Sequence, residues 1–122
     1  QAKQWGGGTM VVPAPMEVYE IMSYPKSGEL LTLSRIREIL AEKHGTTTAC
    51  PLTTGIFAWI SANASEEMMT SGKGSGIAWW RTLKGKGELN PKYPGHILKQ
   101  RDLLIKEGFT VFPKGDNFFV SD

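Results

Sequence analysis

The sequence predicts a mainly α-helical fold with a small β element, and three observations carry this prediction. Apolar residues recur at helical spacing in four separate segments. Proline and glycine stand where such helices would begin and end. Between the third and fourth segments lies a stretch of strand composition, followed by a turn rich in glycine and lysine. The second and third helices, joined by a short turn and followed by a hairpin, have the order of a winged helix-turn-helix.

The N-terminal part is expected to be a flexible arm over residues 1–12, because it contains three consecutive glycines. Pro13 and Pro15 suit the entry of a first helix, in which Val18, Ile21 and Met22 lie near helical spacing. The segment "YPKSGE" then ends this helix. Residues 13–122 are therefore predicted to form a single domain.

The second helix is expected within "LLTLSRIREILAEKHG", and either Thr32 or Ser34 can cap it. Lys43 and His44 favour its negative C-terminal end, and Gly45 is a natural stop. One stripe of this helix is apolar and is expected in the core: Leu33, Ile36, Ile39 and Leu40.

A long third helix is expected to begin at Pro51 and to run to about residue 72. One of its faces holds larger side chains, namely Leu52, Ile56, Trp59, Ile60 and Asn63. The opposite face holds small side chains, namely Thr54, Ala58, Ser61 and Ala62. If the small face is exposed, it permits close approach to a flat or grooved partner. The alternative is that this face packs against another helix.

After a loop at 71–76, residues 77–83 are expected to form a strand, 84–87 a turn and 88–89 a short returning strand that completes the wing. A second turn at 90–95 precedes a last helix over 96–108. The apolar residues expected inward on this helix are Ile97, Leu98, Leu104 and Ile105. A terminal hairpin is expected around "PKGDN".

The basic residues are concentrated in one part of the chain, although the net charge of its 122 residues is only +2. Residues 71–106 carry eight Lys/Arg against two Asp/Glu, whereas the segments on both sides are net acidic. A basic block inside a folded region predicts an anion-binding face, or else a solvated basic surface. No apolar run approaches the roughly 18 residues that span a bilayer, so no membrane partner is expected.

Cys50 is the single cysteine, which excludes an intramolecular disulfide and a metal site built on several thiolates. A reducing cytoplasmic location, without metal or cofactor, is expected. Cys50 precedes Pro51 at the start of the third helix, where a helix N-terminus stabilises a thiolate. It is therefore either a small half-buried turn residue or a reactive thiol.

Several segments together resemble the DNA-binding domain of alkylguanine-DNA alkyltransferases, and most closely their noncatalytic relatives, the alkyltransferase-like proteins. The similar segments, within roughly residues 13–112, are "SGELLTLSRIREILAEKHG", "PLTTGIF", "AWWRTLKGKGEL" and "YPGHILKQRDLLIKEGF". The transferases carry Pro-Cys-His-Arg-Val, in which the cysteine accepts an alkyl group from a flipped guanine. This chain has Trp79 at the cysteine and Trp80 at the histidine, and it keeps Arg81.

The resemblance also assigns expectations to residues outside this motif. Tyr93 matches a tyrosine that lines the alkyl pocket, and Glu107 matches the acid that orients the histidine. Leu33 stands where the family has the tyrosine that helps to rotate the nucleotide, and Pro51 lies near its intercalating arginine. Because indole provides neither nucleophile nor base, Glu107 has no relay to complete. Its other expected role is an ion pair with Arg81 or with Lys106.

The first functional hypothesis is therefore a DNA-binding alkyltransferase-like protein, linked to recognition of alkylated guanine and to DNA repair, without the nucleophile at the usual site. Its expected partners are double-stranded DNA, alkylated or not, and a repair protein. The expected DNA contacts are Thr53, Thr54, Gly55 and Ala58 on the third helix and Arg81, Lys84 and Lys86 at phosphates. The expected residues of the base or alkyl pocket are Trp79, Trp80 and Tyr93.

Three alternatives stay open at this stage. Trp79 and Trp80 can both be structural, in which case they fill the pocket. The scaffold can serve as a winged-helix module for protein interaction or for a small ligand, since a fold does not fix a function. An enzymatic alternative uses Cys50 as the alkyl acceptor.

Overall fold

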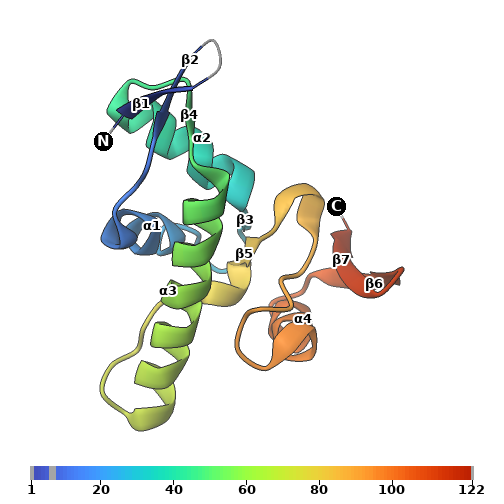
Figure 1. Ribbon diagram of the computed structural model, residues 1–122. Coiled ribbons are helices and arrows are strands. Elements are labelled where there is room, and N and C mark those ends of the chain that lie inside the picture. The colour runs from blue at the N-terminus through green and yellow to red at the C-terminus, as the bar shows by residue number, and fades with distance from the viewer. Residues whose placement is uncertain (1, 6–7, 122) are drawn as a thin grey trace.

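The computed structural model describes residues 2–5 and 8–121 of the chain. About half of this part is helical, with three small sheets beside the helices (Figure 1). The helices are α1 Pro15–Met22, α2 Leu33–His44, α3 Pro51–Ser71 and α4 His96–Lys106, with two short 3₁₀ helices, η1 Trp79–Arg81 and η2 Gly85–Gly87. The prediction of a mainly helical fold with a small β element is confirmed.

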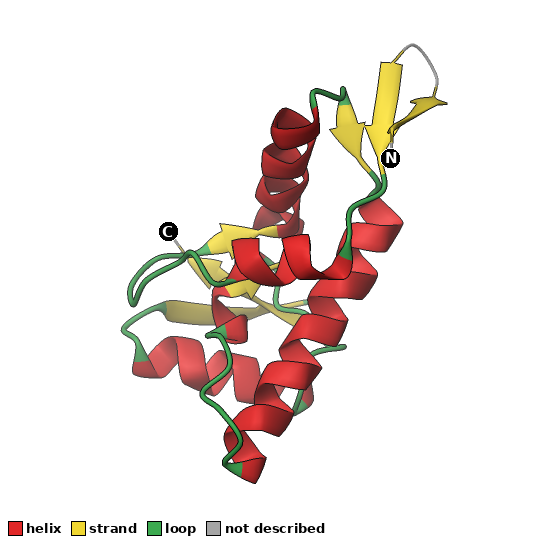
Figure 2. Cartoon of the chain, turned by 90° about the vertical axis from the view of Figure 1, so that its left-hand side faces the viewer, coloured by secondary structure: helices red, strands yellow, loops and turns green. Residues whose placement is uncertain are grey.

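The strands pair in three separate sheets, seen in yellow in Figure 2. They are β1 Ala2–Trp5, β2 Gly8–Val11, β3 Leu31–Thr32, β4 Thr48–Ala49, β5 Thr82–Leu83, β6 Thr110–Lys114 and β7 Asn117–Ser121. The first sheet has the order β1-β2-β4, with β2 antiparallel to β1 and parallel to β4. A parallel pair joins β3 to β5, and β6 and β7 form the predicted C-terminal hairpin.

The helix ends follow the local signals in the sequence. Of the two candidate caps of α2, Thr32 is used: its Oγ1 accepts a hydrogen bond of 3.1 Å from the backbone N–H of Arg35. Gly45 ends α2 with φ 64°, a conformation that glycine adopts without strain. Pro51 is the first residue of α3, where its missing N–H costs no hydrogen bond.

The structure differs from the flexible arm that was predicted over residues 1–12. Residues 2–5 and 8–11 pair as two strands, and β2 also pairs with β4, placing Met10 opposite Thr48 and Val11 opposite Ala49. The side chain of Val11 is buried, which anchors this strand in the core. The prediction for residues 1, 6 and 7 lies outside the described residues. Gly8 begins β2, whose partner β4 lies more than 35 residues away along the chain and has no local signature.

The core has two parts that meet at Trp80. The larger part gathers side chains of α1, α2 and α3 around Trp79, which is fully buried. The smaller part consists of Leu83, Leu89 and Leu104 and lies beneath the β6–β7 hairpin. Trp80 is half-buried and packs against both parts, so the stretch between α3 and β5 holds the two halves of the domain together.

The segment 77–89, which was predicted to form a wing, differs from the prediction. Only Thr82 and Leu83 of the stretch 77–83 form a strand, which pairs with β3, while Trp79–Arg81 form η1. The backbone N–H of Lys84 donates to the carbonyl of Glu88 and closes the turn. Residues 88–89 then pair with β7 through Phe118 and Phe119. The C-terminal hairpin supplies a more distant partner for the expected returning strand.

The expected inward face of α4 is partly wrong. Leu104 is fully buried, but Leu98 and Ile105 are about half exposed. Gln100 takes an inward position instead: its Oε1 accepts from the backbone N–H of Asn90 at 2.8 Å, and its Nε2 donates to the carbonyls of Trp80 and Thr82. A buried side-chain amide is tolerated here because its polar groups are paired. None of the described helices is apolar enough over a sufficient length to cross a bilayer.

Candidate functional site

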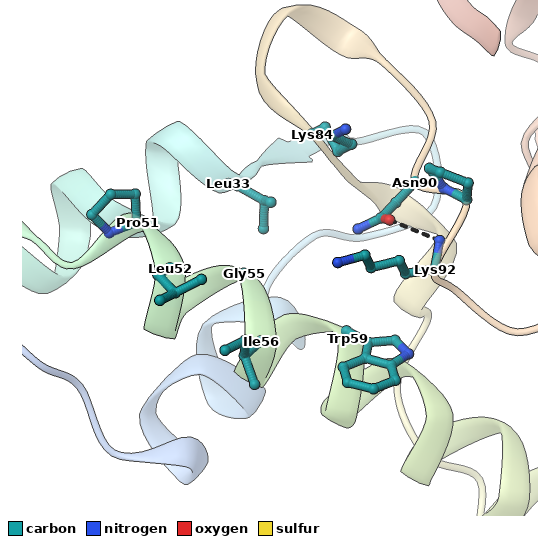
Figure 3. Close-up of a pocket in the computed structure, with 10 residues that line it drawn as sticks. Leu33, Pro51, Leu52, Gly55, Ile56, Trp59, Lys84, Asn90 and Lys92 are labelled. Carbon is teal, nitrogen blue, oxygen red and sulfur yellow. Dashed lines mark hydrogen bonds between the residues drawn. The ribbon is translucent and has the colours of Figure 1, made fainter. Parts of the chain in front are cut away.

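A cleft of about 260 Å³ lies between the first turns of α3 and the segment that connects β5 to α4. We call it the α3 cleft. Its lining residues are Leu33, Pro51, Leu52, Gly55, Ile56, Trp59, Lys84, Asn90, Pro91 and Lys92. Figure 3 shows Trp59 and Lys92 on neighbouring sides of this cleft, with Leu33 directed into it from the start of α2. Most of the lining side chains are apolar.

The α3 wall of the cleft follows from helical periodicity. Leu52, Ile56 and Trp59 lie on one side of α3 because successive residues turn by about 100° around the axis. All three are exposed, and 42% of the Trp59 surface is accessible. An exposed indole beside exposed aliphatic side chains is a surface on which a planar apolar group can pack.

Asn90 is held in the opposite wall by its own hydrogen bonds. The residue is 93% buried, since only 7% of its surface is accessible. Its backbone N–H donates to Gln100, and its side-chain Oδ1 accepts from the backbone N–H of Lys92 at 3.0 Å. With Oδ1 fixed in this way, the Nδ2 group is the end that points into the cleft (Figure 3). The wall therefore presents a positioned hydrogen-bond donor.

The charged groups around the α3 cleft are ammonium groups. Lys84 and Lys92 line it, and the lining contains no Asp or Glu. Lys86 stands exposed at the tip of the 84–88 turn, with φ 67°. The carboxylate of Glu88 lies 3.8 Å from Lys84 Nζ, a long contact between partly exposed groups that neutralises little of the charge. The cleft thus combines apolar walls with donors and positive charge.

The small face of α3 is buried, which corrects two of the predicted DNA contacts. Thr54 and Ala58 have no accessible surface, whereas Thr53 and Gly55 are half-buried. α3 packs against α1 and α2. Bulky side chains such as Trp79 already fill much of the space between these elements. Only small side chains on α3 then allow the helix to pack closely against them. The alternative in which the small face packs against another helix is the one found.

Trp79, Trp80 and Tyr93 form a packed aromatic cluster. The rings of Trp80 and Tyr93 meet the Trp79 ring edge to face, with centroids 5.7 Å and 5.6 Å away. Trp79 has no accessible surface, so no base can stack on it, and its Nε1 donates to Glu66. Burial raises the pKa of the Tyr93 hydroxyl. The alternative of a filled pocket therefore describes these residues, and the expected lining role of Trp79 is corrected.

Arg81 is engaged inside the molecule, which corrects its predicted phosphate contact. Its guanidinium forms an ion pair of 2.8 Å with Glu107 and donates to the carbonyl of Pro25 at 2.9 Å. Burial alone would raise the pKa of Glu107, but hydrogen bonds from Arg81 and from Trp80 Nε1 outweigh it and hold that pKa below its usual range. Of the two ion pairs expected for Glu107, the one with Arg81 is confirmed.

Cys50 is half-buried at the N-cap of α3. The hydroxyl of Thr53 donates to Cys50 Sγ at 3.2 Å, and this contact lowers the pKa of the thiol below its usual value. Both histidines contact other groups: His44 binds Glu17, and His96 lies 3.4 Å from the carbonyl of Pro91. The hydrogen bond from Thr53 favours the thiolate form of Cys50, and among the described residues no hydrogen bond joins Cys50 to a base.

Sequence reasoning missed Asn90 and Lys92 as parts of the site. Both lie in "NPKYPG", which predicts a turn correctly but gives no sign of what the turn faces. Their place opposite Trp59 depends on how β5 and α4 dock. Leu33 was singled out by its family position, and the cleft is where it points.

No protein-family model, curated protein or solved structure matches this chain. Among the described residues, no three His, Cys, Asp or Glu side chains gather in a group that can hold a metal ion.

Proposed function

We propose that this protein binds DNA in the manner of the alkyltransferase-like proteins that it resembles, with the α3 cleft as the site that receives a base. The observation that carries the proposal is the chemistry of the cleft: an exposed Trp59 beside donors from Asn90, Lys84 and Lys92. A nucleotide has a planar apolar base for the indole and acceptor oxygens for the donors.

The proposed scaffold is a winged helix in which α2, residues 45–50 and α3 form the helix-turn-helix. The turn at 84–88 takes the wing position and carries Lys86. The outward face of α3 is apolar, and apolar side chains read little of a major groove besides the thymine methyl. We therefore assign α3 to an unstacked base, and the lysines to the phosphates on either side of it.

The proposed activity is recognition and not alkyl transfer at the family position. Trp79 stands where the transferases carry the nucleophilic cysteine, and indole cannot replace a thiolate. Unstacking a base costs a few kcal/mol, least for a damaged base, and a cleft that accommodates it offsets part of that cost. A bound lesion would then be presented to a repair protein.

The test is fluorescence anisotropy with two matched duplexes, one of which carries a methylated guanine, each at several salt concentrations. If Lys84, Lys86 and Lys92 each neutralise one phosphate, the logarithm of affinity falls with the logarithm of salt at a slope of about −2.7. Lys92→Ala should make that slope less steep by about 0.9, because one phosphate contact is lost. Lys73→Ala is the matched control, since this exposed lysine follows the far end of α3. Salt-independent binding, or none, contradicts the proposal.

A second candidate is a protein-interaction or small-ligand module on the same scaffold. The observation that favours it is the exposed apolar stripe of α3, where Leu52 is 72% and Ile60 is 48% accessible. Exposed apolar patches of this kind often mark binding surfaces. Failure to bind any nucleic acid at low salt, together with capture of an apolar peptide that Ile60→Ser abolishes, would favour this function.

A further inference from the structure

Trp59 stands between two depressions of the surface. One is the α3 cleft, and the other is a wider hollow of about 530 Å³ lined by Trp59, Asn63 and the segment 91–96. The two share three residues, namely Trp59, Pro91 and Lys92. Trp59 thus forms part of the partition between two neighbouring depressions, and the proposed binding of a single base leaves the second depression unexplained.

We infer that Trp59 separates two adjacent nucleotide subsites, so that the chain holds two consecutive nucleotides of an unpaired strand with one base on each side of the indole. This inference rests on the proposed function, and it adds the second subsite and the kind of strand. Every base has a π-face, so stacking on an exposed indole favours unpaired strands with little regard to sequence.

The charge distribution fits a phosphate between the two bases. Lys92 lines both depressions, so a phosphate that links a base in one depression to a base in the other passes this lysine. The second hollow also contains Gly95 and His96, where α4 begins without a side-chain cap on its N-terminal N–H groups. The backbone N–H of His96 donates to the carbonyl of Tyr93, but the positive end of the helix still favours an anion. Neither depression is lined by a carboxylate.

Two base subsites make a prediction about affinity that a single base subsite does not make. Both bases must contribute to affinity, and both contributions must depend on Trp59. Asn63 and Ile60 lie on the same exposed side of α3, but Ile60 lines neither depression. Ile60→Ala therefore provides a matched control: it removes an exposed apolar side chain of α3 and leaves both depressions unchanged.

The experiment is competition against a fluorescein-labelled oligothymidine that binds the full chain at low salt. The competitors are the dinucleotide pTpT, the same molecule with its second base replaced by an abasic deoxyribose, and an acidic peptide. We expect pTpT to compete at least about fivefold more strongly than its abasic form, the smallest effect of one base–aromatic stack. Trp59→Leu should weaken pTpT by about 25-fold or more and remove the difference between the two competitors.

The outcomes distinguish failure of the two-subsite inference from failure of the proposed function. If pTpT and its abasic form compete equally while the labelled strand is bound, there is one base subsite: the inference falls and the proposed function stands. If Ile60→Ala weakens pTpT as much as Trp59→Leu does, the effect is not specific to the partition, and the inference also falls. If the labelled strand is not bound at low salt, or if the acidic peptide displaces it as well as pTpT does, the inference falls. The proposed function falls with it only if the duplex that carries methylated guanine is also not bound at low salt.

Discussion

The guanidinium of Arg81 donates hydrogen bonds to the carboxylate of Glu107 from two of its nitrogens, Nε and Nη2. Arg81 Nε lies 3.1 Å and 3.0 Å from the two carboxylate oxygens, and Nη2 lies 2.8 Å from Oε2. Both side chains are mostly buried, with 16% and 12% of their surfaces accessible. This pair links η1 to the end of α4 and leaves Arg81 unavailable to an external phosphate.

Glu107→Leu should lower the free energy of unfolding by about 3 kcal/mol, because removal of one partner leaves a largely buried charge unpaired. Thermal and urea unfolding measure the change. The control is Asp102→Asn, whose exposed pair with Arg101 is worth at most about 1 kcal/mol. Equal losses in the two variants would mean that the Arg81 pair adds nothing beyond a surface contact.

The carboxylate of Glu17 should make the free energy of unfolding depend on pH in the acidic range. Burial by itself raises its pKa, but the backbone N–H of Ala14 together with Lys43 and His44 outweighs burial and lowers the pKa to about 2. A pKa that is lower in the folded state stabilises the fold above the usual carboxyl pKa, and this stabilisation is lost as the pH falls through the folded value. Glu17→Gln should therefore be less stable than the parent chain at pH 7.

Urea unfolding between pH 7 and pH 2 measures this effect of Glu17. The gap between the parent chain and Glu17→Gln should be full above about pH 4.5 and should shrink as the pH approaches 2. Glu67→Gln, at an exposed position of α3, controls for the loss of a negative charge. A gap that stays constant over the whole range would contradict the assignment.

Truncation of Trp79 and of Trp59 should change stability to very different extents. Trp79→Ala should cost about 3–5 kcal/mol of stability, because it opens a large cavity in the core. It also removes the indole N–H that donates to Glu66 at 3.3 Å. Trp59→Ala should change stability by less than about 1 kcal/mol, since the side chain is partly exposed. Chemical denaturation of both variants distinguishes a filled aromatic cluster from an open pocket over Trp79, in which the two losses would be alike.

Cys50 should react with iodoacetamide at pH 7 faster than an unperturbed thiol, because the hydroxyl of Thr53 lowers its pKa. Thr53→Val removes this hydrogen bond and should slow the reaction. Timed mass spectrometry measures both rates. The same instrument tests the alkyl-acceptor alternative: incubation with alkylated DNA should leave the mass at Cys50 unchanged, and an added alkyl group there would establish transfer.

Much of the local structure could be predicted from the sequence because its signals are short-range. Thr32 and Gly45 cap α2 through hydrogen bonds and a φ value that depend on a few neighbouring residues. Pro51 begins α3, and "PKGDN" turns the C-terminal hairpin. The strands were less predictable: β2 pairs with β4 and β3 with β5 across long sequence separations. Two-residue strands have too few side chains to specify such partners.

The candidate site was predicted only in part. The composition singled out the basic block, and within it Lys84 does line the α3 cleft. Arg81 carries the same charge in the same block, yet it is held by Glu107, a partner 26 positions away. Charge counted along the sequence cannot distinguish a solvated cation from one that a distant carboxylate neutralises.

The sequence by itself determined where the four α-helices of the described chain lie and approximately where they end, because caps, prolines and glycines act within one or two turns. The tertiary structure alone decided which face of α3 is buried. Both faces of that helix are largely uncharged, one small and one bulky, so hydrophobicity did not choose between them. The choice fell to shape: Trp79 fills the core from the other side, and only the small face, with Thr54 and Ala58, can approach it closely. That choice turned Trp59 outward and created the cleft.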